Sequence, residues 1–113
     1  MMSSEPTPLF QLLSTPLAKE QVRYLRDVAE LTRLRELLYK TLKSVEYRLQ
    51  VSPRDWGDPF HNLTGMKMVA YQRLFEHLVI VYAVHEEDSL VWIQSIKPGL
   101  GHLLVGDPNF PSV

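Results

Sequence analysis

The chain has 113 residues, of which 45% are hydrophobic and 22% are charged. This length suits one domain, residues 1–113, with a single core. Twelve Lys and Arg residues against thirteen Asp and Glu leave a formal charge of −1, whereas non-specific nucleic-acid binders carry a basic excess. The lack of cysteine excludes a disulfide framework, a thiolate metal site and a cysteine nucleophile.

The first residues, MMSSEPTP, have neither the charged start nor the apolar centre of a signal peptide. No apolar run reaches the roughly 18 residues that a membrane-spanning helix needs. We therefore expect a cytoplasmic protein without membrane contact, in which residues 1–7 form a disordered N-terminus.

A short apolar run, LFQLL at residues 9–13, lies between Pro8 and Pro16. Prolines at both ends suit an edge strand better than a helix, because proline cannot donate to a strand ladder. We predict a short N-terminal strand here.

From Leu17 to Val51 the chain has no Gly or Pro and follows a helical period. Two apolar stripes recur at spacings of three and four: Ala18, Val22, Leu25 and Ala29, then Leu31, Leu34, Leu38, Leu42, Val45 and Leu49. The stripes point about half a turn apart at roughly 100° per residue. One straight helix would need partners on opposite faces, whereas two antiparallel helices with a break at residues 30–33 direct both stripes to one core. We predict the hairpin, with Thr32 as the N-cap of its second helix.

Residues 54–65, RDWGDPFHNLTG, hold a Trp, two acids, a His and two Gly. This density fits either an active site or a connector between the helical and the strand-forming parts of the chain. We favour the connector, because Pro53 would end the helix and the Gly-Asp-Pro tripeptide would make a turn. Trp56 and Phe60 would then cap the core from the side, and Gly65 would open the next strand.

Between residues 66 and 97 the period becomes that of strands, in MKMVAYQRLF, HLVIVYAVH and LVWIQSIK. The segment HLVIVYAV is apolar on both alternating faces, which is typical of a central strand covered on both sides. Residues 86–89 form a hairpin turn with solvated charges rather than a metal site. The Gly- and Pro-rich tail, residues 98–113, is predicted to be irregular.

The predicted fold is therefore α+β: a short N-terminal strand, a helical hairpin and a three-stranded antiparallel meander, with the helices packed on one face of the sheet. The other apolar face of the central strand then needs a cover. The tail, a second copy of the chain or a partner peptide could supply it.

This order of elements, with LVIVYAVHEEDSLVWIQSIKP after the hairpin, resembles the RelE/ParE toxin superfamily of bacterial toxin–antitoxin systems. Members run strand, two helices and meander. Their penultimate strand ends in a Val-Tyr-x-Val-like stretch, here residues 81–84, and their last strand ends in a basic residue, here Lys97. The likeness covers roughly residues 8–104. It implies a RelE-like fold and a toxin, either a ribosome-dependent mRNA endonuclease or a gyrase poison, neutralised by an antitoxin.

In the RNA-cleaving members, the catalytic face carries Lys and Arg on the meander and a Tyr or His near the C-terminus. Carried over by position, the catalytic residues are Tyr71, Arg73, Lys97 and His102, with no metal and no cofactor. Cleavage by 2′-OH attack needs a base, a cation for the phosphorane and an acid, for which His102 is the candidate. Tyr71 and Arg73 share one face of their strand, and Lys97 joins them if the strand ends align.

Each assignment has a structural alternative: Tyr71 packs at the sheet edge, Arg73 pairs with an acid such as Glu76, and the histidines are surface or capping residues. Two positions also depart from the family pattern, since Val79 and Pro98 stand where members commonly carry basic residues. The second hypothesis is therefore a non-catalytic RelE-fold module that binds a partner or a second copy through the uncovered sheet face.

Overall fold

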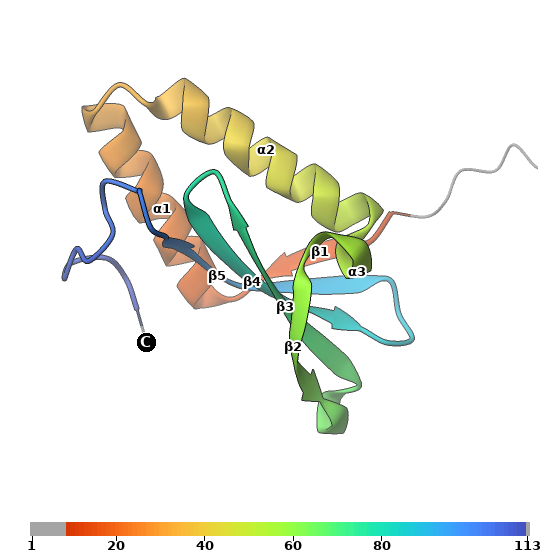
Figure 1. Cartoon of the computed structure of the whole chain (residues 1–113). Helices are drawn as coiled ribbons and strands as arrows, with labels where there is room; N and C mark the ends of the chain where they lie inside the picture. Colours follow the sequence, from red (N-terminus) through yellow and green to blue (C-terminus); the bar gives the residue numbers. More distant parts are fainter. Residues whose placement is uncertain (1–8, 113) are drawn as a thin grey trace, which may run out of the picture.

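The computed structural model describes residues 9–112 and has an α+β architecture (Figure 1). Five strands form one mixed open sheet in the order β1-β5-β4-β3-β2. The strands are β1 (Gln11–Ser14), β2 (Asp58–Leu63), β3 (Met68–Phe75), β4 (Leu78–His85) and β5 (Leu90–Pro98). The helices are α1 (Pro16–Leu31), α2 (Arg35–Val51) and the short α3 (Pro53–Trp56), with a 3-10 turn, η1 (Thr64–Met66). The α+β class is confirmed, and the N-terminus predicted to be disordered lies outside the described residues.

The helical zone folds as the predicted hairpin, with the break between Leu31 and Arg35. Thr32 was wrongly predicted as the N-cap of the second helix. It ends α1 instead, because its Oγ1 donates to the carbonyl oxygen of Val28 at 2.8 Å. The N-cap position of α2 is Leu34, which makes no side-chain cap.

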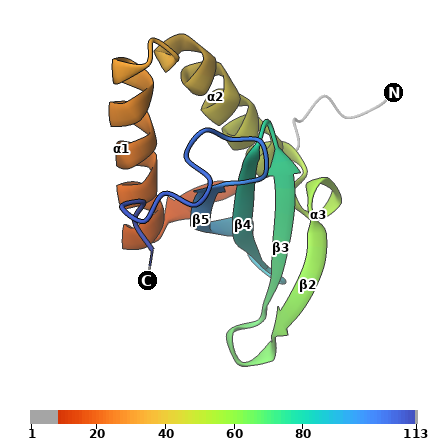
Figure 2. The same ribbon diagram turned by 60° about the vertical axis from the view of Figure 1, so that its left-hand side comes forward.

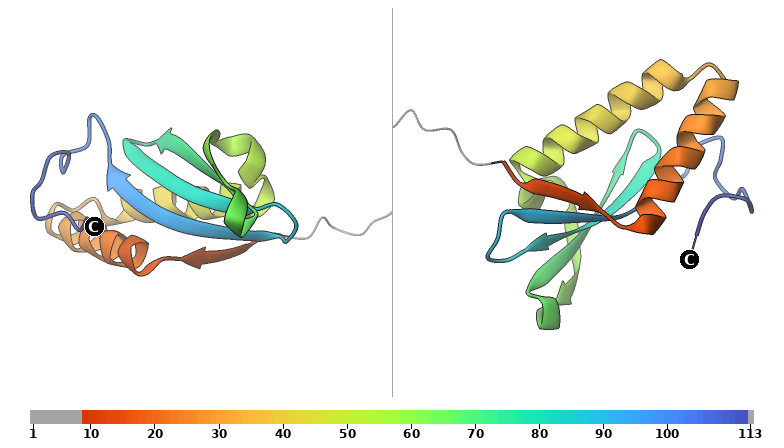
Figure 3. Two further views of the ribbon diagram at one scale, coloured as in Figure 1. Left: turned by 90° about the horizontal axis from the view of Figure 1, so that it is seen from below. Right: turned by 180° about the vertical axis from the view of Figure 1, so that it is seen from behind.

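The meander of β3, β4 and β5 is antiparallel, and β4 is the middle strand of the sheet, as its apolar sequence predicts. The N-terminal segment forms the edge strand β1, which pairs in parallel with β5. Figure 3 shows β1 beside β5, with α1 continuing from its end. The first and last strands within residues 9–112 are therefore neighbours.

Strand β2 is absent from the sequence-based prediction, which placed a turn at the Gly-Asp-Pro tripeptide and only three strands in the meander. It pairs with β3 across a bulge between Pro59 and His61. Its side chains are almost all exposed, so no apolar alternation marks it in the sequence. Proline is tolerated because β2 is an edge strand. Gly65 does not open a strand either, since it lies in η1 and β3 begins at Met68.

The sheet has one side covered by helices and one open side. Four side chains of β4 are at most 1% exposed and belong to the core on the helix side: Leu78, Ile80, Tyr82 and Val84. Figure 2 shows α1, α2 and the C-terminal tail on the same side of β3 and β4. We call the other side the open face; its exposed or half-buried residues are Gln72, Leu74, Val79, Val81, Trp92 and Lys97. Met68, Ala70, Ala83 and Ser95 on the same side are at most 8% exposed. Leu74 is 59% exposed there and Trp92 is 36% exposed.

The tail, from Gly99 onward, consists of turns and packs on the helix side. Tyr24 Oη donates to Asp107 Oδ2 at 2.7 Å, and the rings of Tyr24 and Phe110 meet edge to face at 5.5 Å. Gln21 Nε2 donates to the carbonyl oxygen of Pro111 at 3.0 Å. Of the three covers considered for the open face, the tail is therefore excluded as far as Ser112.

Tyr82 joins the central strand to the junction of α2 and α3. Its buried Oη donates to the carbonyl oxygen of Pro53 at 2.6 Å. Its ring stacks on Tyr71, with centroids 5.4 Å apart, and lies 6.1 Å from the ring of Trp56. A Cβ at Gly57 would lie 2.6 Å from the hydroxyl, so only glycine allows this approach. Trp56 thus belongs to the core.

Phe60 was predicted to cap the core beside Trp56, and this is wrong. It lies on the edge strand β2 with 52% of its surface exposed.

We predict that Tyr82→Phe lowers the free energy of unfolding by about 1–3 kcal/mol, because the buried carbonyl of Pro53 loses its donor. Urea unfolding measures this. The matched control is Tyr47→Phe, whose ring is 61% exposed and whose effect should stay within about 0.5 kcal/mol.

The same variant tests a pH dependence. Burial raises the pKa of Tyr82 from its ordinary 10.0 to about 12, so folding favours the neutral phenol. This contribution to stability is complete below pH 10 and is lost as the pH rises through 12. Tyr82→Phe should lack that loss; an unchanged alkaline unfolding profile would contradict the role given to Tyr82.

Candidate functional site

Tyr71 and Arg73 lie on the same side of β3, as predicted, but both are engaged in the fold. Tyr71 is 8% exposed and stacked on Tyr82, one strand in from the edge. Arg73 Nη1 donates to the carbonyl oxygen of Trp56 at 2.8 Å, and its guanidinium lies 5.6 Å from the Trp56 ring centroid. Its partner is therefore α3, and not Glu76 as the structural alternative proposed. The guanidinium holds α3 against the sheet.

Lys97 lies on the other side of the sheet from Arg73. Arg73 pairs with Ile80, whereas Lys97 pairs with Val79, the neighbouring residue of β4, and consecutive residues of a strand point to opposite sides. The reason is a bulge in β5, where Gln94 is the extra residue. With unbroken alternation Lys97 would have faced the helix side, beside the other predicted residues. The condition for Lys97 to join Tyr71 and Arg73 is therefore not met in this structure.

His102 is in a third place, at a cavity of about 260 Å³ that we call the hairpin cavity. The cavity lies between the helical hairpin, the β3–β4 turn and the tail, which loops between them (Figure 2). Most of its lining is aliphatic: Leu25, Val28, Ala29, Leu34, Leu37, Leu38, Leu78, Leu103 and Leu104. Periodicity marks Leu25, Ala29, Leu34 and Leu38 as core residues and gives no sign that they surround a cavity.

The polar lining of the hairpin cavity comes from the tail, from the β3–β4 turn and from Thr32 and Thr41 of the helical hairpin. His102 Nδ1 accepts the N–H of Leu104 at 3.0 Å, so the ring proton is on Nε2. Burial, and then the charge of nearby His77, lower the pKa of His102. His77 Nδ1 is 3.2 Å from the carbonyl oxygen of Leu100, and its own carbonyl accepts the N–H of Gly99 at 2.7 Å. The tail is thus fastened to the turn.

The β3–β4 turn at the rim of the cavity has an unusual backbone. Its two central residues, Glu76 and His77, have φ of 49° and 64°, as in the type I′ turns that normally contain Asn-Gly. A side chain in this region costs about 1–2 kcal/mol. Gly101, with φ of 91°, passes so close that a Cβ there would lie 2.8 Å from His77 Nδ1. Without glycine in the turn, the sequence gives no hairpin signal here.

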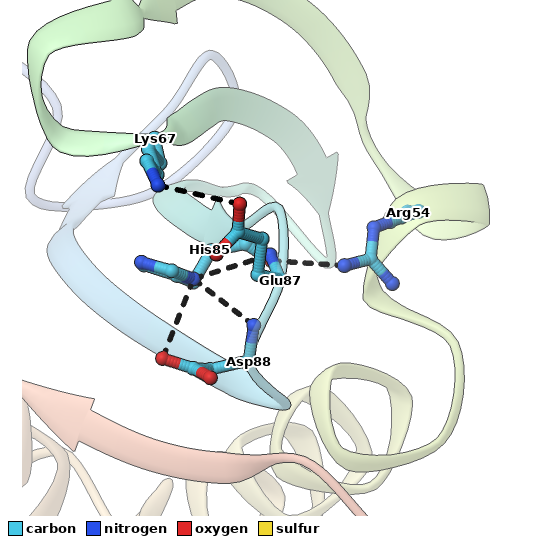
Figure 4. A network of polar contacts seen from close by, with 5 residues as sticks. All are labelled: Arg54, Lys67, His85, Glu87 and Asp88. Atoms are coloured by element: carbon cyan, nitrogen blue, oxygen red, sulfur yellow. Dashed lines mark hydrogen bonds and ion pairs between the residues drawn. The ribbon is translucent and has the colours of Figure 1, made fainter.

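A second polar cluster lies at the far end of the meander (Figure 4). His85 Nδ1 accepts the N–H groups of Glu87 and Asp88 at 3.2 and 3.0 Å, and Arg54 Nη2 donates to the His85 carbonyl at 2.8 Å. Lys67 Nζ and Glu87 Oε1 are 3.3 Å apart. These contacts fix the predicted turn between β4 and β5. Among residues 9–112 no group of three or more His, Cys, Asp or Glu side chains could hold a metal ion.

Comparison of the chain with protein-family models, curated proteins and solved structures gives no match. None of the helices within residues 9–112 is long and apolar enough to cross a membrane. A groove of about 710 Å³ also lies between α1 and α2, with charged residues such as Arg26, Glu36 and Lys43 in its lining. The open face and the hairpin cavity differ from it in exposing mainly apolar side chains.

Glu76→Asn should raise the free energy of unfolding by about 0.5–1 kcal/mol, because Asn tolerates the left-handed backbone better than Glu. Urea unfolding measures the change. Glu86→Asn, in the other hairpin turn, is the matched control and should have no such effect. A Glu76→Asn variant no more stable than the parent would contradict a strained turn.

The lowered pKa of His102 makes the tail sensitive to acid. Folding favours the neutral ring, so its contribution to stability is complete above the ordinary value of 6.5 and is lost as the pH falls below it. Protonation of Nδ1 removes the acceptor of Leu104, whose amide should then exchange faster. NMR titration and amide exchange test this, with the exposed His61 as the internal control; titration of His102 at or above 6.5 would refute it.

Proposed function

We propose that the chain is a RelE/ParE-like protein of a toxin–antitoxin pair, working in the cytoplasm by binding a protein partner over its open face. The order of strand, helical hairpin and antiparallel meander supports the resemblance. The Val-Tyr-Ala-Val stretch lies on the central strand and Lys97 near the end of the last strand. Strand β2 is added at the sheet edge and leaves this order unchanged.

The observation that carries the proposal is the exposed apolar surface of the open face. Leu74 and Trp92 are 59% and 36% exposed there, beside the half-buried Val79 and Val81. Contiguous apolar patches are uncommon on monomers, and Trp is enriched among residues that dominate binding energy. Lys97 and, on β2, Asp58 are charged groups on this side of the sheet, so the partner segment should present apolar side chains and an acid opposite Lys97.

The positions of the predicted catalytic residues argue for binding rather than RNA cleavage. A base, a cation and an acid must reach the same phosphodiester. Tyr71 is buried in a stack, Arg73 holds α3, Lys97 lies across the sheet and His102 lines a separate cavity. These four residues do not form one site in this arrangement.

A metal-independent mRNA endonuclease is the second candidate, and one feature favours it. Trp92 and Lys97 both lie on the open face, and an aromatic ring and a cation along one surface are the groups that stack on and neutralise single-stranded RNA. The two candidates thus share a surface and differ in the chemistry performed there.

Inducible expression of the full chain in a bacterial host separates the candidates. We expect growth arrest with intact messages, measured by optical density and primer extension. Lys97→Glu should relieve the arrest because it opposes the acid of the partner, as should Trp92→Ser. The matched control, Lys40→Glu on the exposed surface of α2, should not.

Three other outcomes would contradict the proposed function and favour another one. Cleaved messages that become intact in Arg73→Ala and Lys97→Ala would establish the endonuclease. Unimpeded growth at high expression would exclude a toxin. A dimer of the purified chain in sedimentation, dissociated by Trp92→Ser, would show that a second copy covers the open face.

A further inference from the structure

We propose that the hairpin cavity is a binding site for a small, uncharged amphipathic molecule with an aliphatic chain, such as a medium-chain alcohol, ester or amide. The site is distinct from the open face and does not depend on the proposed function. Nine aliphatic side chains line it, contributed by both helices, β4 and the tail.

The size of the cavity suits a small ligand. Its volume is about 260 Å³, near the lower end of small-molecule sites, which begin at about 300 Å³. An engineered apolar cavity of about 150 Å³ already binds benzene. The hairpin cavity therefore has room for a molecule longer than one aromatic ring.

The cavity is open to solvent along an apolar rim. Three of its lining residues, Leu34, Leu37 and Leu103, are 40%, 57% and 59% exposed. Leu31 and Leu100, next to this rim in the chain, are 84% and 85% exposed. An aliphatic chain entering here would bury surface that the described part of the protein leaves in water, which is favourable at about 25 cal/mol per Å².

The polar lining selects the head group. Nδ1 of His102 is occupied by the Leu104 N–H, so Nε2–H is its remaining donor. No Lys or Arg is among the lining residues of this cavity, whereas Glu76 is. A carboxylate would meet the like charge of Glu76 and no Lys or Arg, whereas an alcohol, ester or amide oxygen can accept from Nε2–H. Charge thus favours an uncharged ligand.

The test uses the full chain with 1-octanol and octanoate as probes at pH 8, followed by methyl NMR. Octanol should shift the methyl signals of Leu25, Leu38 and Leu78 and leave that of Leu12 in place, and octanoate should bind at least about tenfold more weakly. His102→Phe should weaken octanol binding about fivefold, the value of one hydrogen bond.

Filling the cavity should abolish binding. Ala29→Leu adds volume from α1, and Thr41→Leu adds it from α2 if the first variant fails to fold; each should weaken octanol binding more than about tenfold. Val51→Leu, a similar enlargement at an exposed position of α2, is the matched control and should bind as the parent does.

Three results would overturn the inference. The first is a folded protein whose cavity methyl signals do not move up to the solubility limit of octanol. The second is a filled variant that binds as tightly as the parent. The third is tighter binding of octanoate than of octanol, which would remove the uncharged head group from the proposal.

Discussion

The hydrogen bond from Tyr82 to the Pro53 carbonyl determines how the second half of the chain is placed. It brings the end of α2 over the middle of the sheet, and it requires Gly57 because a Cβ there would collide with the hydroxyl. Once α3 is held in this position, Trp56 packs against Phe75 and Tyr82, and the chain emerges beside β3 to form β2. The junction that looked like a simple connector is therefore an anchor of the core.

The same anchor explains why Tyr71 and Arg73 do not take part in the catalytic set that the sequence predicts. The carbonyl and the indole ring of Trp56 engage the guanidinium of Arg73, and the ring of Tyr82 covers that of Tyr71. Tyr71 and Arg73, which RNA cleavage would need beside a phosphodiester, thus stabilise the fold on the helix side of the sheet. Order of elements and site chemistry are separable properties of a chain.

The sequence predicts the parts of the fold that bury apolar side chains at a regular period. The hairpin follows from two opposed stripes, and the central position of β4 follows from its two apolar faces. The sequence does not predict strand β2, because its side chains are almost all exposed and show no apolar alternation. The sequence also does not predict on which side of the sheet Lys97 lies. One extra residue, Gln94, reverses the alternation of side chains along β5. The sequence does not predict the hairpin cavity, because helical leucines that line a cavity and those that fill the core have the same spacing.

The pairing of β1 with β5 has a consequence for how the protein is made. Gln11 leaves the ribosome well before its partner, Leu90, which follows only after three helices and three further strands. The helical hairpin can form from local contacts during synthesis, whereas the sheet gains its parallel edge only when β5 emerges. Such distant pairing slows folding and leaves unpaired strands exposed in the meantime. A product that stalls before β5 would hold β1 and one side of β4 without partners, and would be a substrate for chaperones or proteases.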